Sequence, residues 1–148
     1  MQLSRHFTLE QMCENSIAKS LGIDNMPDMA AMDNLQCLCN NVLEPLAERG
    51  IKLEIMSGFR SKELNKIVGG DDCSPHMKGE AVDIIGENWK EIAYPDQLKT
   101  LIIWAHYLIT YSYFDHLALV TNGRQWWMHI SCVKLYGDNR NLVSVTMK

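Results

Sequence analysis

The sequence contains no run of apolar residues that approaches the length of a membrane-spanning helix. Its first six residues, Met1–His6, also lack the apolar core of a secretory signal peptide. These two absences predict a protein that is made in the cytoplasm without a signal peptide and that does not insert into a membrane.

An excess of positive charge is also missing. Asp and Glu together number 18 and Lys and Arg 14, so the formal net charge is -4. Binding of nucleic acid without sequence preference requires a basic surface. The composition therefore predicts no nucleic-acid partner. No internal repeat or low-complexity segment is present.

A disulfide framework is absent as well. The five cysteines are odd in number and scattered along the chain, at Cys13, Cys37, Cys39, Cys73 and Cys132. This pattern is typical of a protein made in a reducing compartment. Most of them are expected to be small core residues. Cys73 lies three residues before His76 and is an alternative metal ligand.

The composition is that of one globular domain covering residues 1–148. Hydrophobic residues make up 47% of the chain and charged residues 22%, which are ordinary values. A chain of 148 residues is long enough to bury a core without disulfides or a structural metal. Apolar spacing and turn residues predict a succession of helices and strands. The predicted helices are 8–21, 27–49, 61–68 and 98–109, and the predicted strands are 51–55, 81–85, 113–120, 127–132 and 142–147.

Three side chains in the middle and late parts of the sequence predict a metal site. Asp83 and His129 each lie in a short apolar run typical of a buried strand, and His76 precedes Asp83 in a glycine-containing loop. A buried carboxylate without a partner is strongly destabilising. Two imidazoles and one carboxylate around Zn²⁺ leave a fourth position open for water, as in catalytic zinc sites. The alternative from spacing alone is an ordinary ion pair of Asp83 with His76 or Arg60.

The segments around these residues resemble the zinc D-Ala-D-Ala peptidase family, whose members cut the peptides of bacterial cell walls, and in particular its small phage-associated branch. The resemblance extends over roughly Phe7 to Ser131. The segments that carry it are Phe7-Thr8-Leu9-Glu10, Leu21–Asn25, Val42–Leu46, Ser57-Gly58-Phe59-Arg60-Ser61, Leu64-Asn65, Val68-Gly69-Gly70, Ser74-x-His76-x-x-Gly79-Glu80-Ala81-x-Asp83, Phe114-Asp115 and Trp127-x-His129-x-Ser131.

The resemblance implies an α+β fold of the Hedgehog/D,D-peptidase type, with helices packed on a small antiparallel sheet. It implies zinc held by His76, Asp83 and His129, and an Arg60 that stabilises developing negative charge beside the substrate. Ser57, Ser74 and Trp127 are the expected substrate-binding residues.

The expected reaction is hydrolysis of a peptidoglycan stem-peptide bond, by a D,D-carboxypeptidase or an endolysin-like endopeptidase. We expect a monomer that reaches the cell wall by a route such as a holin, a phage particle or lysis.

One position departs from the family pattern. The family carries an acidic general base, usually Glu, on the strand that leads toward the last His, and here Val120 takes its place. Three alternatives follow: an inactive zinc domain that binds cell-wall peptide, for example a phage structural component; a base supplied by another residue; or activity without a base. His116 shares the face of Val120 but lies four residues, or about 13 Å, before it along the strand. A metal-free scaffold with an ion-paired Asp83 is a further alternative.

Overall fold

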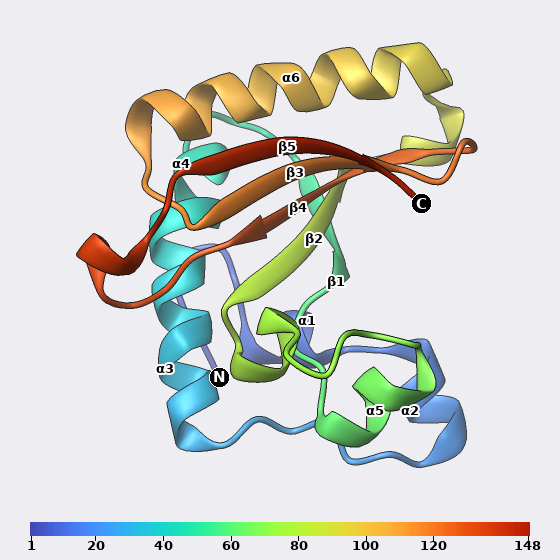
Figure 1. Ribbon diagram of the computed structural model, residues 1–148, viewed down its shortest axis with the longest axis vertical. Helices are drawn as coiled ribbons and strands as arrows, with labels where there is room; N and C mark the ends of the chain where they lie inside the picture. Colours follow the sequence, from blue (N-terminus) through green and yellow to red (C-terminus); the bar gives the residue numbers. More distant parts are fainter.

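A five-stranded sheet runs through the computed structural model, which describes all of residues 1–148 (Figure 1). The strands are β1 (Leu53–Ser57), β2 (Ala81–Gly86), β3 (His116–Thr121), β4 (Trp126–Ser131) and β5 (Leu142–Met147). The α-helices are α1 (Leu9–Cys13), α2 (Ser16–Leu21), α3 (Met29–Leu38), α4 (Glu44–Ala47), α5 (Lys62–Ile67) and α6 (Tyr94–Tyr111). The predicted α+β class is confirmed.

The strand order is β1-β2-β4-β3-β5. The pairs β1–β2, β2–β4 and β4–β3 are antiparallel. The fifth strand is parallel to β3, so the sheet is mixed, whereas the sequence predicted an antiparallel one. The segment after β4 contains the short 3₁₀ helix η4 (Tyr136–Asp138) and returns the chain to the start of β3. There the Leu142 N–H donates to the carbonyl of Asp115, which sets the parallel direction of β5.

The two faces of the sheet have different roles. One face packs under α3, α4 and α6 and contributes Val82, Ile84, Leu117 and Met128 to the main hydrophobic core. Side chains of a strand alternate between faces, so Asp83 lies on the other face together with Ala118 and Val120, which are not in that core. The helix-free face therefore carries the polar residues singled out in the sequence.

The N-terminal helix begins where the sequence predicts. Thr8 caps α1 with a capping box to Gln11. The predicted single helix that ends before Gly22 is instead two helices. The Asn15 side chain accepts hydrogen bonds from the N–H groups of Ile17 and Ala18 and so caps a new helix, α2. Such a cap satisfies N–H groups that would otherwise bond to the preceding helical turn.

The predicted long helix over 27–49 is helical but not uniform. A π-helical stretch, η1 (Cys39–Leu43), joins α3 to α4 just before Pro45. Proline has no N–H and clashes with the carbonyl four residues earlier, which here belongs to Asn41. That carbonyl accepts the hydroxyl of Ser112 instead. Pro45 therefore interrupts the helix, as predicted, and Gly50 ends the helical region with a positive φ of 76°.

Helix α6 crosses the helix-covered face of the sheet (Figure 1). Apolar spacing predicts an inward face of Leu98, Leu101, Ile102, Ala105, Leu108 and Ile109. Leu101, Ala105 and Leu108 are buried as expected, together with Trp104, whereas Ile102 and Ile109 are exposed. The helix is apolar around much of its circumference, so spacing alone did not fix the edges of the inward face. None of the helices in the structure combines the length and the apolarity needed to cross a membrane.

Candidate metal centre

Strand pairing brings two of the predicted ligands together. Asp83 on β2 lies directly opposite His129 on β4 in the antiparallel register, and both side chains lie on the helix-free face. His76 comes from the short 3₁₀ helix η2 (Pro75–Lys78), which the Ser74 side chain caps by accepting the His76 N–H. Three segments that are separate in the sequence thus meet at one point.

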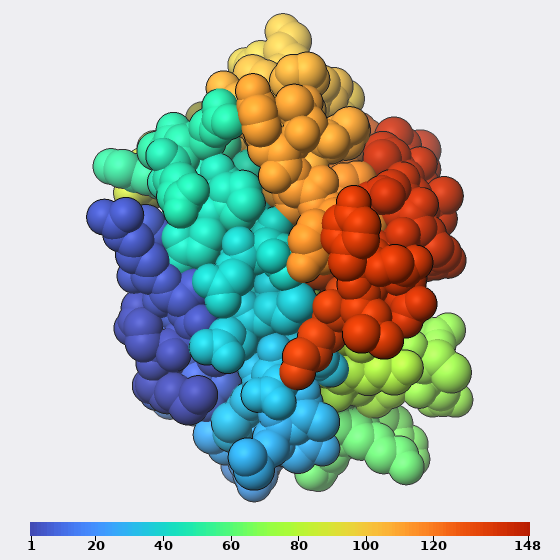
Figure 2. Space-filling model, turned by 90° about the vertical axis from the view of Figure 1, so that its left-hand side faces the viewer, coloured from blue at the N-terminus to red at the C-terminus, as the bar shows by residue number.

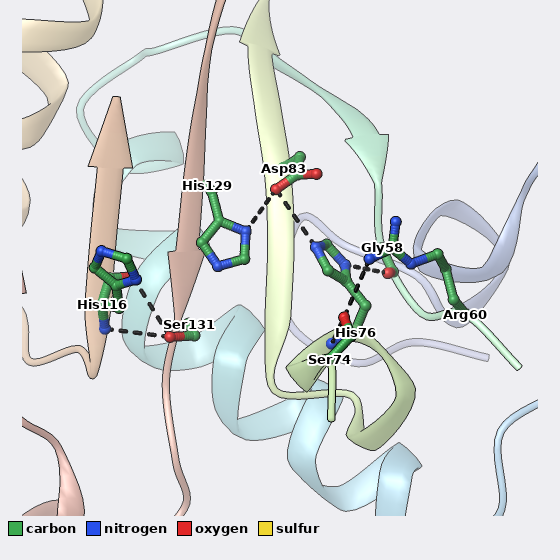
Figure 3. Close-up of polar contacts among 8 residues, drawn as sticks. All are labelled: Gly58, Arg60, Ser74, His76, Asp83, His116, His129 and Ser131. Carbon is green, nitrogen blue, oxygen red and sulfur yellow. Dashed lines mark hydrogen bonds and ion pairs between the residues drawn. The ribbon is translucent and has the colours of Figure 1, made fainter. Parts of the chain in front are cut away.

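The three side chains converge closely (Figure 3). Asp83 Oδ1 lies 2.8 Å from His129 Nδ1 and 3.5 Å from His76 Nε2. One ligand atom from each of the three residues lies within 4.8 Å of the other two. The structure therefore brings together the residues that the sequence predicted as zinc ligands. Cys73, the alternative ligand, is exposed and is not in this cluster.

The His76 ring is held in one orientation by the backbone. Its Nδ1 lies 2.8 Å from the Gly58 carbonyl oxygen, so this nitrogen carries the proton and donates it. The other nitrogen, Nε2, is left as an acceptor that faces Asp83. A backbone carbonyl in this role commonly fixes the tautomer of a metal-binding histidine. His76 is therefore already arranged to bind an ion through Nε2.

Gly58 is required at its position because the chain passes very close to α1. A Cβ added at Gly58 would lie 2.2 Å from the Met12 carbonyl oxygen, which also accepts the N–H of Phe59. Only glycine avoids this overlap. The same residue supplies the carbonyl that holds His76, so α1 and the His76 ring depend on one backbone segment.

The electrostatics of the centre favour an ionised Asp83. Burial on its own raises the pKa of this carboxyl, but its interactions with the His129 and His76 rings outweigh burial and hold the pKa below its usual range. A charged carboxylate between two imidazoles is a suitable donor set for a divalent cation.

The donor set fits Zn²⁺ in type and spacing. Ligand atoms about 2.0–2.2 Å from a tetrahedral zinc are roughly 3.3 Å apart, which is close to the 3.5 Å between Asp83 Oδ1 and His76 Nε2. Imidazole and carboxylate are both common zinc ligands. With only three protein donors, the set leaves one position of a tetrahedral site without a side chain.

Arg60 lies next to these residues and is linked to them through Ser74. The Arg60 Nη2 donates to the Ser74 hydroxyl at 3.1 Å, and that same oxygen accepts the His76 N–H at 3.3 Å. Burial lowers the pKa of the Arg60 guanidinium, and the nearby charge of Asp83 partly offsets this effect. The buried Arg60 Nε has no hydrogen-bond partner in the protein.

A cleft of about 350 Å³ opens over the centre. Arg60, Ser74 and Trp127 line it together with the three clustered residues. Trp126, one position earlier in β4, belongs to the core instead. The predicted substrate-binding Ser57 lies opposite Asp83 on β1 but does not line the cleft.

The position of the missing acidic residue faces this cleft. Val120 lines it, together with His116 from the start of the same strand. The His116 ring centre is 6.0 Å from that of His129, and its Nε2 is hydrogen-bonded to Ser144 on β5. Asp115 points elsewhere and is paired with Arg140. Apart from Asp83, Asp71 is the one carboxylate among the lining residues.

Asn25 is a structural contributor that sequence reasoning did not single out as a site residue. Its amide donates to the carbonyls of Cys13 and Phe59 and accepts the N–H of Ser61. These bonds hold the loop that carries Arg60 against the N-terminal helices. A buried Asn in a loop has no sequence signal of its own, because its partners lie far away in the chain.

Comparison with known protein families gives a match. A family model described as Peptidase M15 matches residues 5–118. The matched segment contains His76 and Asp83 and ends within β3, so His129 lies beyond it on the neighbouring strand. No curated protein matches the chain.

Proposed function

The chain belongs to the peptidase M15 family, and from this premise we propose that it is a zinc metallopeptidase that hydrolyses peptide bonds of peptidoglycan stem peptides. This family membership bears out the resemblance found in the sequence. The reaction is that of a D,D-carboxypeptidase or of an endolysin-like endopeptidase, and the residues that would hold zinc are His76, Asp83 and His129.

The observation that carries this proposal is the convergence of the three donors in an open cleft, with the proton of His76 fixed on the nitrogen that faces away from Asp83. Zinc bound there would supply Lewis acidity and would lower the pKa of water. A purely structural zinc site would be closed by a fourth protein ligand, and this cluster has only three members.

Substrate binding is the role we assign to the charged and aromatic residues around the centre. Arg60 and Lys148 give the cleft two cations, which suit a peptide that ends in a carboxylate. The Arg60 guanidinium is positioned by Ser74 and has an unpaired Nε directed at no protein acceptor. Trp127 supplies an apolar wall for the small side chains of a stem peptide.

A second candidate is a zinc domain that binds cell-wall peptide without cutting it. It is favoured by one observation: Val120 occupies the place of the usual acidic residue and faces the cleft. A missing general base typically lowers the rate by about 10²- to 10⁴-fold. The two candidates therefore share a metal centre and a substrate and differ in turnover.

Zymography on purified cell walls distinguishes these candidates, with the zinc content of the same sample measured by elemental analysis. We expect clearing by the wild type and none by Asp83→Asn, which keeps the size of the side chain but removes its charge. A zinc-loaded protein that binds the walls and releases no peptide would establish the second candidate in place of the first.

The ligand assignment has a separate test in zinc stoichiometry. We expect His76→Ala and His129→Ala each to reduce bound zinc to well below one ion per chain. His106→Ala is the matched control, because His106 is exposed on α6 and lies outside the cluster. Unchanged zinc content in both variants would show that His76 and His129 are not zinc ligands.

A further inference from the structure

The outer edge of β5 is an unpartnered feature that lies outside the set of catalytic side chains. This strand pairs with β3 on one side, and no strand pairs with its other side. Val143, Val145 and Met147 are 48%, 65% and 78% exposed. Edge strands with apolar side chains readily pair with another chain unless charges or prolines block them. Residues Leu142–Met147 contain neither a charge nor a proline.

The backbone of β5 directs its free groups outward at the same three residues. Leu142 and Lys148 donate their N–H groups to β3. Hydrogen-bonding direction alternates along a strand, so the odd-numbered residues Val143, Val145 and Met147 direct N–H and C=O away from β3. The exposed apolar side chains and the free backbone groups therefore belong to the same residues.

These three side chains lie on the helix-covered face of the sheet. Val143 and Val145 are in register with Leu117 and Leu119, which are buried in the core under α6. The exposed Ile102 and Ile109 belong to the flank of α6 opposite the one that carries Tyr107 and Tyr111, which contact Arg49 after α4. Figure 2 shows the C-terminal part of the chain, in red, beside the orange end of α6. We call the exposed side chains of Val143, Val145 and Met147, together with those of Ile102 and Ile109, the β5 patch.

In place of the monomer expected from the sequence, we propose that the β5 patch is the interface with a second copy of this chain, formed by antiparallel pairing of the two β5 strands about a two-fold axis at Val145. In this register Val145 lies opposite Val145 of the other copy, and Val143 lies opposite Met147. All three residue pairs use the outward-directed backbone groups, so each pair exchanges two hydrogen bonds. A two-fold interface requires a patch that is complementary to itself, and this register provides it.

Charge does not oppose the pairing of two copies at this strand. In the proposed register Lys148, the nearest charged residue after the strand, lies opposite the uncharged Leu142, so no like charges meet. Strand pairing fixes the relative orientation of the two copies. The exposed flank of α6 adds apolar surface toward the roughly 600 Å² that each partner buries in a small specific interface. We expect a reversible dimer with a dissociation constant on the order of 1 μM.

The dimer would have one continuous sheet with the two β5 strands at its centre. A two-fold axis perpendicular to the sheet keeps the faces aligned, so both clefts would open on the same side. Thr146 and Lys148 line the cleft of each copy, which places the two clefts near each other across the central strands. Such a pair would present two sites to the same region of a polymeric substrate.

Sedimentation velocity over a range of protein concentrations tests this proposal without reference to zinc or activity. We expect the wild type to shift from one chain to two as concentration rises. Val145→Lys should raise the dissociation constant at least about tenfold. Leu21→Lys is the matched control, since Leu21 is 60% exposed on α2, far from β5 in the sequence, and should dimerise like the wild type. A wild type that stays monomeric throughout, or a Val145→Lys variant that dimerises normally, would overturn the proposal.

Cross-linking gives a second measurement that does not depend on a charged variant. In a Cys73→Ser background, which removes the exposed cysteine, Val145→Cys should form a disulfide-linked dimer under mild oxidation. Opposed residues in this pairing have Cα atoms about 5.5 Å apart, within the range of disulfides. Leu21→Cys in the same background should not cross-link. Equal cross-linking at both positions would contradict the two-fold contact at Val145.

Discussion

Val120 is the residue on which the two proposed functions differ, namely a peptidase and a zinc domain that binds cell-wall peptide without cutting it. The residue lines the cleft and stands where the family resemblance implies an acidic general base. Substituting Val120→Glu should raise the rate of stem-peptide hydrolysis by about 10²- to 10⁴-fold, the usual contribution of a general base. Zinc stoichiometry should stay the same, because Val120 is not in the cluster of three.

Val120→Gln is the control for this gain of activity. It has nearly the same shape as the Glu variant and cannot accept a proton at neutral pH. Peptide release by the two variants should be compared by chromatography at equal zinc content. An equal increase with Gln, or no increase with Glu in a zinc-loaded sample, would show that the cleft is not limited by a missing base.

Gly58 contributes both to the close packing against α1 and to the orientation of the His76 ring. Gly58→Ala should lower the free energy of unfolding by about 1–3 kcal/mol, because its Cβ would overlap the Met12 carbonyl. The displaced Gly58 carbonyl would no longer orient His76, and loss of such a partner typically weakens metal affinity about 10- to 100-fold.

Urea unfolding and zinc titration measure the two effects of Gly58→Ala. Gly137→Ala is the control, since a Cβ at Gly137 meets no atom within 4 Å. A Gly58→Ala protein with wild-type stability and wild-type zinc affinity would show that the backbone can move aside at this point.

Much of the site at this scale could be predicted from the sequence. Asp83 and His129 stand out because each is a polar residue in a strongly apolar strand, and strand alternation correctly placed His116 and Val120 on one face. The Gly58 carbonyl and the Asn25 amide could not be found in this way. Their roles depend on contacts with residues 12 or more positions away, such as His76 for Gly58 and Cys13 for Asn25.

At the scale of elements, Glu44 at the start of α4 fixes the N-terminal segment. Its carboxylate accepts hydrogen bonds from the Ser4 hydroxyl and the His6 N–H and pairs with the His6 ring. Burial alone would raise the pKa of Glu44, but the hydrogen bonds from Ser4 and His6 outweigh it and lower the pKa. The charged carboxylate thus stabilises the folded state more than the neutral one.

This lowered pKa fixes the direction of the pH dependence. The stabilisation by Glu44 is fully present above its unfolded pKa of about 4.3 and is lost as the pH falls through the lower folded-state value. Glu44→Gln should therefore reduce the free energy of unfolding by about 1–3 kcal/mol at pH 7, and the difference from wild type should shrink toward pH 3.

Urea unfolding of Glu44→Gln at pH 7 and pH 3 measures this dependence. Glu48→Gln, one turn further along and exposed, should change stability little at either pH. A difference between Glu44→Gln and wild type that is the same at both pH values would contradict the assignment to the charged carboxylate.

Element types were easier to predict than their arrangement. The strands predicted at 113–120, 127–132 and 142–147 are present as β3, β4 and β5. The parallel direction of β5 could not be predicted, because alternation looks the same in either direction. The inward face of α6 was predicted in part. Leu101, Ala105 and Leu108 are buried as expected, but Ile102 is exposed and Trp104 is buried, because both are apolar and only packing against the sheet decides between them.

At the scale of the whole molecule, zinc binding should stabilise the fold. Zinc at about 100 times its dissociation constant adds roughly 2.7 kcal/mol if the unfolded chain does not bind it. For a domain of this size, that corresponds to an increase in Tm of about 5–10 °C. Calorimetry of chelator-treated and zinc-reconstituted protein measures the difference.

Asp83→Asn provides the control for this thermal shift. The variant keeps the strand pairing of β2 with β4 but loses the charged donor, so zinc should leave its Tm unchanged. A shift of the same size in Asp83→Asn would mean that the ion stabilises the protein from some other place.

The opposition of Asp83 and His129 across β2 and β4 also has a kinetic consequence. The two residues are 46 positions apart in the chain, and closing so long a loop delays contact formation during folding. Neither residue can share an ion with the other until β4 has docked against β2. Refolding from denaturant should therefore recover zinc uptake no earlier than the burial of Trp126 and Trp127 on β4. Tryptophan fluorescence followed together with zinc uptake would measure the order of these two events.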